Sequence, residues 1–384
     1  MGNPPAPGTK ITRPSGTDDT EAVMKFLFDD ESFSFEALRT AGFTLYGGAD
    51  LGEVLATACN IGEGDEASWH RAWKATAQRL QAAGENARAA GYWVSAREAL
   101  LRASNYYRTA ADFLLEKPAT DPEMRVLSAG QHDSFAAAAA LFDTPVQAVS
   151  IPYEGTTLPA YLFLVDDSGA ARPTIIYNSG YDSTREESYF VIAAAALRRG
   201  YNVLAFDGPG QGAVLREQNL VMRPDWEAVI TPVVDYALTR GEIAVGKIVL
   251  FGYSLGGYLV ARAAAFEHRV AALILDDGIH DFHAALRWQP AAFYRVMDRR
   301  RPRRRRGPRA DDAHRRQHAA PVGAAQRDVG LRGRLLRRPD PQGRGLHPRR
   351  RRPPDHRSHP DHGPGQRPVP QGPAATGPQG PHQC

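Results

Sequence analysis

The sequence is poor in several features that would assign it to a special class of protein. It has two cysteines in 384 residues, Cys59 and Cys384, so a disulfide framework is not expected and a reducing compartment, the cytoplasm, is predicted. It has no run of eighteen apolar residues, and its first residues lack the apolar core of a signal peptide, so no membrane association is expected. A hydrophobic content of 42% nevertheless suffices for a sizeable buried core.

Lysine and aromatic residues are both missing from the last quarter of the chain, residues 299–384. This segment holds 22 arginines, 6 aspartates and 15 of the 29 prolines. Its net charge is +16, which leaves −12 for the first 298 residues of a chain whose total is +4. Such a composition cannot bury enough apolar surface to fold by itself, so we predict a disordered tail.

Two hypotheses account for this tail. A basic arm would bind nucleic acid or an acidic partner, but without lysine or aromatic rings that stack on bases we do not expect nucleic acid as a partner. The alternative is a reading-frame shift near residue 300 of a GC-rich gene, because misread GC-rich codons yield Arg, Pro, Gly, Ala and His. Back-translating residues 354–384 in a shifted frame permits an apolar strand that ends in an Asp loop, although the middle base of each shifted codon is free. We favour the frameshift.

The first 298 residues divide into three parts. Residues 1–20, rich in Pro, Gly, Thr and Asp, are predicted to be a disordered lead-in. In residues 21–145, a helical domain, apolar side chains recur every three or four positions and predict helices at 68–90 and 95–115, separated at Gly91.

In residues 146–298 short β-rich runs alternate with helices. We predict strands at 146–153, 158–165, 174–178, 202–206, 247–251 and 272–275, with helices at 185–199, 225–239 and 255–266. The first two strands are close enough to form a hairpin. Strands that are joined by helices make a mostly parallel sheet covered on both faces.

The stretch Gly252-Tyr-Ser-Leu-Gly256 fits the pattern G-x-S-x-G, between strand 247–251 and an Ala-rich helix. A tight turn from strand to helix strains the serine backbone, and small residues at both Gly positions prevent clashes. The hydroxyl of Ser254 then projects at the positive end of the following helix. We predict that Ser254 is a catalytic nucleophile; the alternative is a glycine-rich turn without chemistry.

An acyl-transfer nucleophile also needs donors for the negative charge that develops on the substrate oxygen. The backbone amide of Leu255 is the first predicted donor of this oxyanion hole. The second is predicted in the loop after strand 174–178, where Gly180 lets the backbone approach the substrate and the amide of Gly180 or Tyr181 donates. An ordinary turn with a helix cap is the alternative for this loop.

A third glycine-rich stretch, Asp207-Gly-Pro-Gly-Gln-Gly212, follows strand 202–206. A phosphate-binding loop is the competing interpretation, but no Lys-Ser/Thr pair follows and no helix is predicted to start immediately. We favour a structural turn at the pocket floor. No cofactor or metal is predicted.

Three stretches, GYDSTREE (180–187), FDGPGQG (206–212) and GYSLGG (252–257), occur together with RPDWE (223–227) and SAREALLRASNYY (95–107). This combination resembles one branch of the α/β-hydrolases, the 2,6-dihydroxypseudooxynicotine hydrolases and the fungal enzymes that shorten heptaketide pigment precursors. The resemblance covers residues 21–290. It implies an α/β-hydrolase fold with an N-terminal helical cap that covers the active site and helps to form a homodimer. It also implies a small carbonyl substrate, in which a carbon–carbon bond beside a ketone, or an ester, is hydrolysed.

In this family an acid residue orients a His that deprotonates the serine, in the chain order Ser, Asp, His. Both residues should follow two further strands after 272–275, and the chain offers no such strands. Several acidic and His residues come too early for these roles and are predicted to shape the pocket or cap a helix, namely Asp276, Asp277, His280, Asp281 and His283. The triad Asp and His are therefore unidentified. We predict a sheet truncated after about its sixth strand and an impaired enzyme; a non-catalytic binding protein is the alternative.

Overall fold

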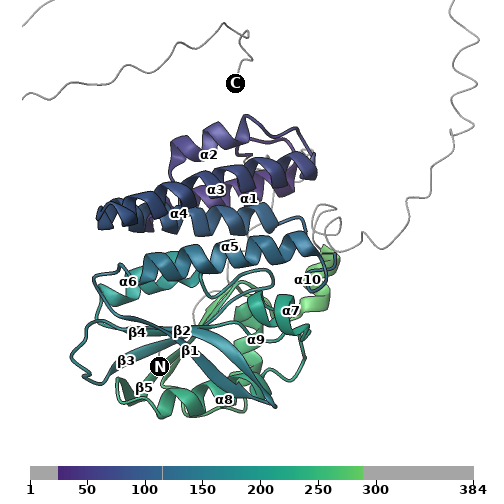
Figure 1. Ribbon diagram of the computed structural model, residues 1–384. Coiled ribbons are helices and arrows are strands. Elements are labelled where there is room, and N and C mark those ends of the chain that lie inside the picture. Colours follow the sequence, from purple (N-terminus) through teal and green to yellow (C-terminus); the bar gives the residue numbers. More distant parts are fainter. Residues whose placement is uncertain (1–24, 115, 289–384) are drawn as a thin grey trace, which may run out of the picture. The chain divides into compact units, whose positions relative to one another are not determined.

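The computed structural model describes residues 25–114 and 116–288, shown in colour in Figure 1. The predicted lead-in, residues 1–20, and the predicted tail, residues 299–384, lie outside the described residues. No helix within the described ranges combines the length and the apolar character that a membrane crossing requires.

The first half of the described chain is helical, as predicted. Four of its α-helices begin after an aspartate whose carboxylate accepts hydrogen bonds from first-turn amides, which satisfies donors that have no partner within the helix. Gly91 has a φ of +79° and separates two long helices, as the sequence predicts. The helical elements are α1 (Glu31–Gly42), η1 (Phe43–Tyr46), α2 (Leu51–Ala58), α3 (Glu66–Ala89), α4 (Trp93–Ala111) and α5 (Pro122–Ala139).

The second half forms a mostly parallel sheet of six strands among the described residues, in the order β1-β2-β4-β3-β5-β6. The first two strands are an antiparallel hairpin, and β3 runs parallel to both β4 and β5. All six predicted strands are present, with ends that differ by up to four residues. They are β1 (Val146–Tyr153), β2 (Thr156–Phe163), β3 (Arg172–Asn178), β4 (Asn202–Phe206), β5 (Ile243–Tyr253) and β6 (Ala272–Asp276).

Alternate side chains of the central strands enter two separate cores. Leu204 on β4 and Leu250 on β5 pack against the helices α8 (Glu227–Leu238) and α9 (Leu255–Ala264). Val203 and Phe251, their neighbours in sequence, face a core that also contains Phe135 of α5. The helical half is therefore joined to the sheet through a shared hydrophobic core. Figure 1 shows α5 lying between the other helices of this half and the sheet.

Two helical predictions differ from the structure. The predicted helix 185–199 is a π-helical segment, Tyr189–Ala193, followed by the short α6 (Ala194–Leu197). The prediction that no helix starts after the third glycine-rich stretch is wrong, because α7 (Gly212–Gln218) begins at its last glycine. There the buried carboxylate of Asp207 accepts a hydrogen bond from the amide of Ala213 at 3.0 Å, which fixes the first turn of α7. The last described helix is α10 (Phe282–Trp288).

Candidate active site

Ser254 lies between the end of β5 and the start of α9, in the strand–turn–helix context that the sequence predicts. Its φ of +54° and ψ of −132° are a strained conformation for a residue with a side chain. The Ser254 amide donates to the carbonyl of Asp276 at 2.9 Å, which ties the turn to the end of β6. The Ser254 side chain is exposed, so a substrate can reach its hydroxyl.

The two glycines of the turn are required by backbone contacts. A Cβ on Gly252 would lie 2.3 Å from the carbonyl oxygen of Gly256, and a Cβ on Gly256 would lie 2.4 Å from the carbonyl oxygen of Asn178. Neither backbone atom can move without displacing a strand end or the first turn of α9. The pattern G-x-S-x-G is therefore set here by close packing of backbone on backbone.

Gly180, in the loop after β3, packs directly on Ser254. A Cβ on Gly180 would lie 2.9 Å from the Cβ and 3.2 Å from the Oγ of Ser254. Leu255 is the first residue of α9, where amides have no acceptor within the helix and the helix dipole is positive. The structure thus brings the loop of Gly180 and Tyr181 together with Ser254 and Leu255, while the choice of donating amide stays a prediction.

An arginine of the helical half makes hydrogen bonds to the segment that follows Gly180 and Tyr181. Arg39 of α1 donates through Nε and Nη2 to the carboxylate of Glu187, both at 2.8 Å, and through Nη1 to Asp182 at 2.9 Å. Its Nη2 also donates to the hydroxyl of Ser183 at 3.2 Å. Arg39 is not among the residues predicted from the sequence; the signal that a basic partner was needed is the charged run 182–187 immediately after a buried strand, since buried charges need partners.

Arg39 belongs to a buried cluster in which carboxylates outnumber guanidinium groups. Arg108 of α4 donates to Asp112 at 3.0 Å and lies 3.5 Å from Glu36. Burial raises the pKa of Glu36 and raises the pKa of Asp112 well above its usual range. Burial also acts on Asp182, but there the adjacent Arg39 guanidinium outweighs it and the pKa is lowered. Glu36 and Asp112 therefore retain protons more readily than Asp182 as the pH rises.

The third glycine-rich stretch, residues 207–212, makes hydrogen bonds and packing contacts with other parts of the protein. The carboxylate of Asp207 accepts from the backbone amide and from Nη1 of Arg185, at 2.8 and 2.9 Å. Gly208 packs on the ring of Trp226, where an added Cβ would lie 3.0 Å away. A buried carboxylate would repel a phosphate, so these contacts fit the structural turn better than a phosphate-binding loop.

The histidines of the described residues lie on α3 and α5 and on either side of β6; they are His70, His132, His268, His280 and His283. His132 is bonded to Tyr161 and Arg185. Asp281 accepts from the amide of Ala284 at 2.9 Å and so caps α10, a role that the sequence predicts for it. The further strands that would carry a triad Asp and His are not among the described residues.

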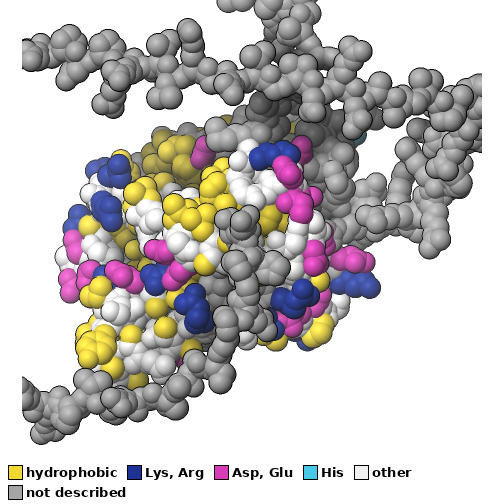
Figure 2. All heavy atoms as spheres, turned by 90° about the horizontal axis from the view of Figure 1, so that it is seen from above, with side chains coloured by type: hydrophobic (Ala, Val, Ile, Leu, Met, Phe, Trp, Pro, Cys, Tyr) yellow, Lys and Arg dark blue, Asp and Glu magenta, His cyan; other side chains and the backbone are white. Residues whose placement is uncertain are grey.

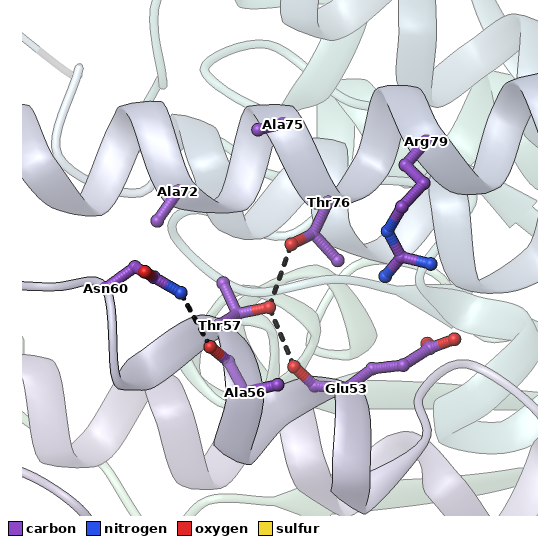
Figure 3. A pocket seen from close by; sticks show the side chains of 8 residues that line it. All are labelled: Glu53, Ala56, Thr57, Asn60, Ala72, Ala75, Thr76 and Arg79. Carbon is purple, nitrogen blue, oxygen red and sulfur yellow. Dashed lines mark hydrogen bonds between the residues drawn. The ribbon is translucent and has the colours of Figure 1, made fainter. Parts of the chain in front are cut away.

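A pocket of about 320 Å³ lies apart from these residues, between α2 and α3 (Figure 3). In it the hydroxyl of Thr57 bonds that of Thr76 at 2.8 Å and the backbone carbonyl of Glu53. The Asn60 side chain likewise bonds the carbonyl of Ala56. Since these polar groups satisfy one another, the pocket gives no argument for a ligand.

The comparison with protein families agrees with the geometry. Residues 173–320 match the family described as the α/β-hydrolase fold. The protein has the α/β-hydrolase fold, as the sequence predicts. The 2,6-dihydroxy-pseudo-oxynicotine hydrolase, a solved structure, matches with a TM-score of 0.56 and 24% identity over 67% of this chain and 69% of that chain. This match supports the fold alone.

Several fungal hydrolases are more similar in sequence. The chain is 43% identical over 265 residues to the hydrolase LUC6 of a Fusarium species. It is 40% identical over 263 residues to the 20-hydroxy-prefusarin hydrolase FUS2 of Gibberella moniliformis. Each match covers 66% of this chain and 62% of the relative, so the chain spans less than two thirds of their length. The resemblance inferred from the motifs is confirmed.

Proposed function

We propose that this α/β-hydrolase is a serine hydrolase that attacks a carbonyl substrate through Ser254. The observation that carries the proposal is the exposed Ser254 hydroxyl beside Gly180 and the first turn of α9. The serine oxygen attacks the carbonyl carbon while its proton passes to a base, and the negative oxygen is stabilised by the amide of Leu255 and that of Gly180 or Tyr181. The bond to the leaving group breaks, the leaving group takes a proton, and water releases the acid from Ser254.

The broken bond is a carbon–carbon bond beside a ketone or the carbon–oxygen bond of an ester. The name of one similar protein, a 20-hydroxy-prefusarin hydrolase, favours a substrate with an oxygen-bearing carbon skeleton. In carbon–carbon hydrolysis the leaving group is a carbanion. The substrate must therefore carry a keto or phenolic neighbour that accepts this charge.

We further propose that this 384-residue chain hydrolyses its substrate slowly, because no triad Asp or His is identified in it. An oxyanion hole and substrate binding alone retain roughly 10³- to 10⁴-fold acceleration over water when a triad member is removed. The frameshift near residue 300 stays our explanation for the missing residues. Genomic DNA that encodes residues 290–384 in one uninterrupted frame would refute it.

Self-association through the helical half is also part of the proposal. Five large apolar side chains of α1, η1 and α2 are exposed, namely Phe35, Leu38, Leu45, Leu51 and Leu55. Figure 2 views this end of the described chain from above, where hydrophobic side chains gather among charged ones. Such a patch favours a homodimer. Analytical ultracentrifugation at micromolar concentration tests this proposal. If the wild type and Leu45→Lys both sediment as monomers, the homodimer is ruled out.

The test of the function is hydrolysis of a p-nitrophenyl ester and of a 1,3-diketone by the purified full chain. We expect slow turnover of at least one substrate that Ser254→Ala abolishes and Ser95→Ala, a change at an exposed serine of α4, leaves intact. Turnover that survives Ser254→Ala would refute the nucleophile. Fast turnover that is lost in Ser254→Ala would support Ser254 as the nucleophile and would refute the proposal that the enzyme is impaired.

A further inference from the structure

Gln211, in the third glycine-rich stretch, is fully buried and uses its whole amide group. Its Nε2 donates to the carbonyl oxygens of Ser179 and Gly180, at 2.7 and 2.9 Å. Its Oε1 accepts from the amide of Gly208 at 3.1 Å, within its own turn. One side chain thus connects the glycine-rich turn to two successive peptide groups of the loop beside Ser254.

These two bonds determine where the neighbouring amides point. In a trans peptide the N–H is directed opposite to the C=O of the same group. The carbonyl of Ser179 shares its peptide with the amide of Gly180, and the carbonyl of Gly180 shares its peptide with the amide of Tyr181. Because both carbonyls point at Gln211, both predicted donor amides point away from it.

The carbonyl of Ser179 has a second donor, held by a residue of another motif. The Nδ2 of Asn178 donates to it at 2.9 Å, and the Oδ1 of Asn178 accepts from the indole nitrogen of Trp226 at 2.8 Å. On the other side, the backbone of Gly256 lies so close that an added Cβ would be 2.6 Å from the Ser179 oxygen. The Ser179 peptide is therefore fixed from three directions, all within buried structure.

We propose that Gln211 is a positioning residue that directs the amides of Gly180 and Tyr181 toward the oxygen of a carbonyl group held at Ser254. This inference rests on the proposed function. It accounts for two stretches to which the sequence analysis gives no catalytic part, the glycine-rich turn with Gln211 and the segment with Trp226. The side chain must offer two N–H donors and one acceptor at fixed length, which glutamine does and glutamate or methionine does not.

The test compares Gln211→Met, similar in length but without donors, with Gln218→Met. Gln218, the last residue of α7, is a matched control, since its amide group makes hydrogen bonds to Thr156 and to the Thr157 carbonyl in the β1–β2 hairpin. Two quantities are measured on the full chain: hydrogen exchange of the backbone segment 178–184, and the rate at which a fluorophosphonate labels Ser254. For Gln211→Met we expect exchange faster by about tenfold or more and labelling slower by roughly 10²-fold, the scale of losing an oxyanion donor. Gln218→Met should change neither.

Each outcome decides the inference. Unchanged exchange in Gln211→Met, or faster exchange with labelling as fast as in the wild type, overturns it. If the wild type is not labelled at Ser254 at all, the proposed function fails, and exchange in segment 178–184 alone decides whether Gln211 holds the loop. If Gln211→Met does not fold, Gln211→Glu replaces it, since a protonated carboxyl donates one hydrogen bond and a carboxylate none. Its labelling rate relative to wild type should then rise as the pH is lowered, and a flat ratio contradicts the inference.

Discussion

The two sides of the candidate site differ sharply in burial. On the side of β3, Asn178 and Ser179 are fully buried and bonded. On the other side all five residues of β6 are exposed, including Leu273 at 38% and Leu275 at 45%. Leu273 pairs directly with Leu250 of β5, which is fully buried. The β3 side of the candidate site is thus buried at Asn178 and Ser179, while β6 ends the described sheet with exposed apolar side chains.

The largest loss of stability is expected when the buried cluster around Arg39, which joins the helical half to the loop after β3, is broken. Arg39→Met removes the hydrogen-bonded guanidinium partner of Glu187 and Asp182 and, among the described residues, leaves Glu187 only Arg108 at 3.9 Å; breaking a buried ion pair in this way costs about 3–5 kcal/mol. Urea unfolding measures the loss. The control is Arg97→Met, whose partner Asp143 is 91% exposed and whose loss should cost about 0–1 kcal/mol. Equal losses would mean that the cluster does not stabilise the loop after β3.

The paired residues Leu250 and Leu273 test the difference in burial between β5 and β6 directly. Leu250→Ala should lower the free energy of unfolding by about 2–5 kcal/mol, because a buried leucine leaves a cavity. Leu273→Ala, at the partner position on β6, should cost less than about 1 kcal/mol, since much of that side chain already contacts solvent. A large cost for Leu273→Ala would show that β6 is covered in solution.

A smaller effect is expected at the turn that carries Ser254. Gly256→Ala places a methyl group 2.4 Å from a backbone oxygen, and overpacking of this kind costs about 1–3 kcal/mol. Gly241→Ala is the matched control, because nothing lies within 4 Å of its added Cβ. Thermal unfolding compares the two variants. A Gly256→Ala chain as stable as Gly241→Ala would contradict the close packing of the turn against the loop after β3.

The last prediction concerns pH and the buried Glu186, which is paired with Arg185 and His132. Burial of Glu186 raises its pKa, but Arg185 and His132 outweigh burial and hold the pKa at about 2, below its ordinary 4.5. A lowered pKa stabilises the fold above the unfolded value and loses this contribution as the pH falls toward the folded one. The stability difference between wild type and Glu186→Gln should therefore shrink between about pH 5 and pH 3 in urea unfolding. A constant difference would contradict this assignment.

A feature could be predicted from the sequence when the residues that determine it are close together along the chain. The turn at Ser254 is encoded in five consecutive residues, and the strands in local runs, so both were predicted. The contact of Arg39 with Glu187 joins residues 148 apart, so the charged run 182–187 indicates that a partner is needed but not which residue it is. The role of Gln211 was missed for the same reason, because its bonds to Ser179 and Gly180 depend on how β3 and β4 lie side by side. The start of α7 was missed because the acceptor for its first-turn amide at Ala213 is the side chain of Asp207, six residues earlier.

The most direct test of the central claim is peptide mass analysis of the full chain after reaction with a fluorophosphonate. The account predicts a single adduct on Ser254, formed slowly, and absent from both Ser254→Ala and the denatured chain. An adduct at another serine, or no adduct on Ser254 in the folded protein, would contradict the claim that this turn presents a nucleophile.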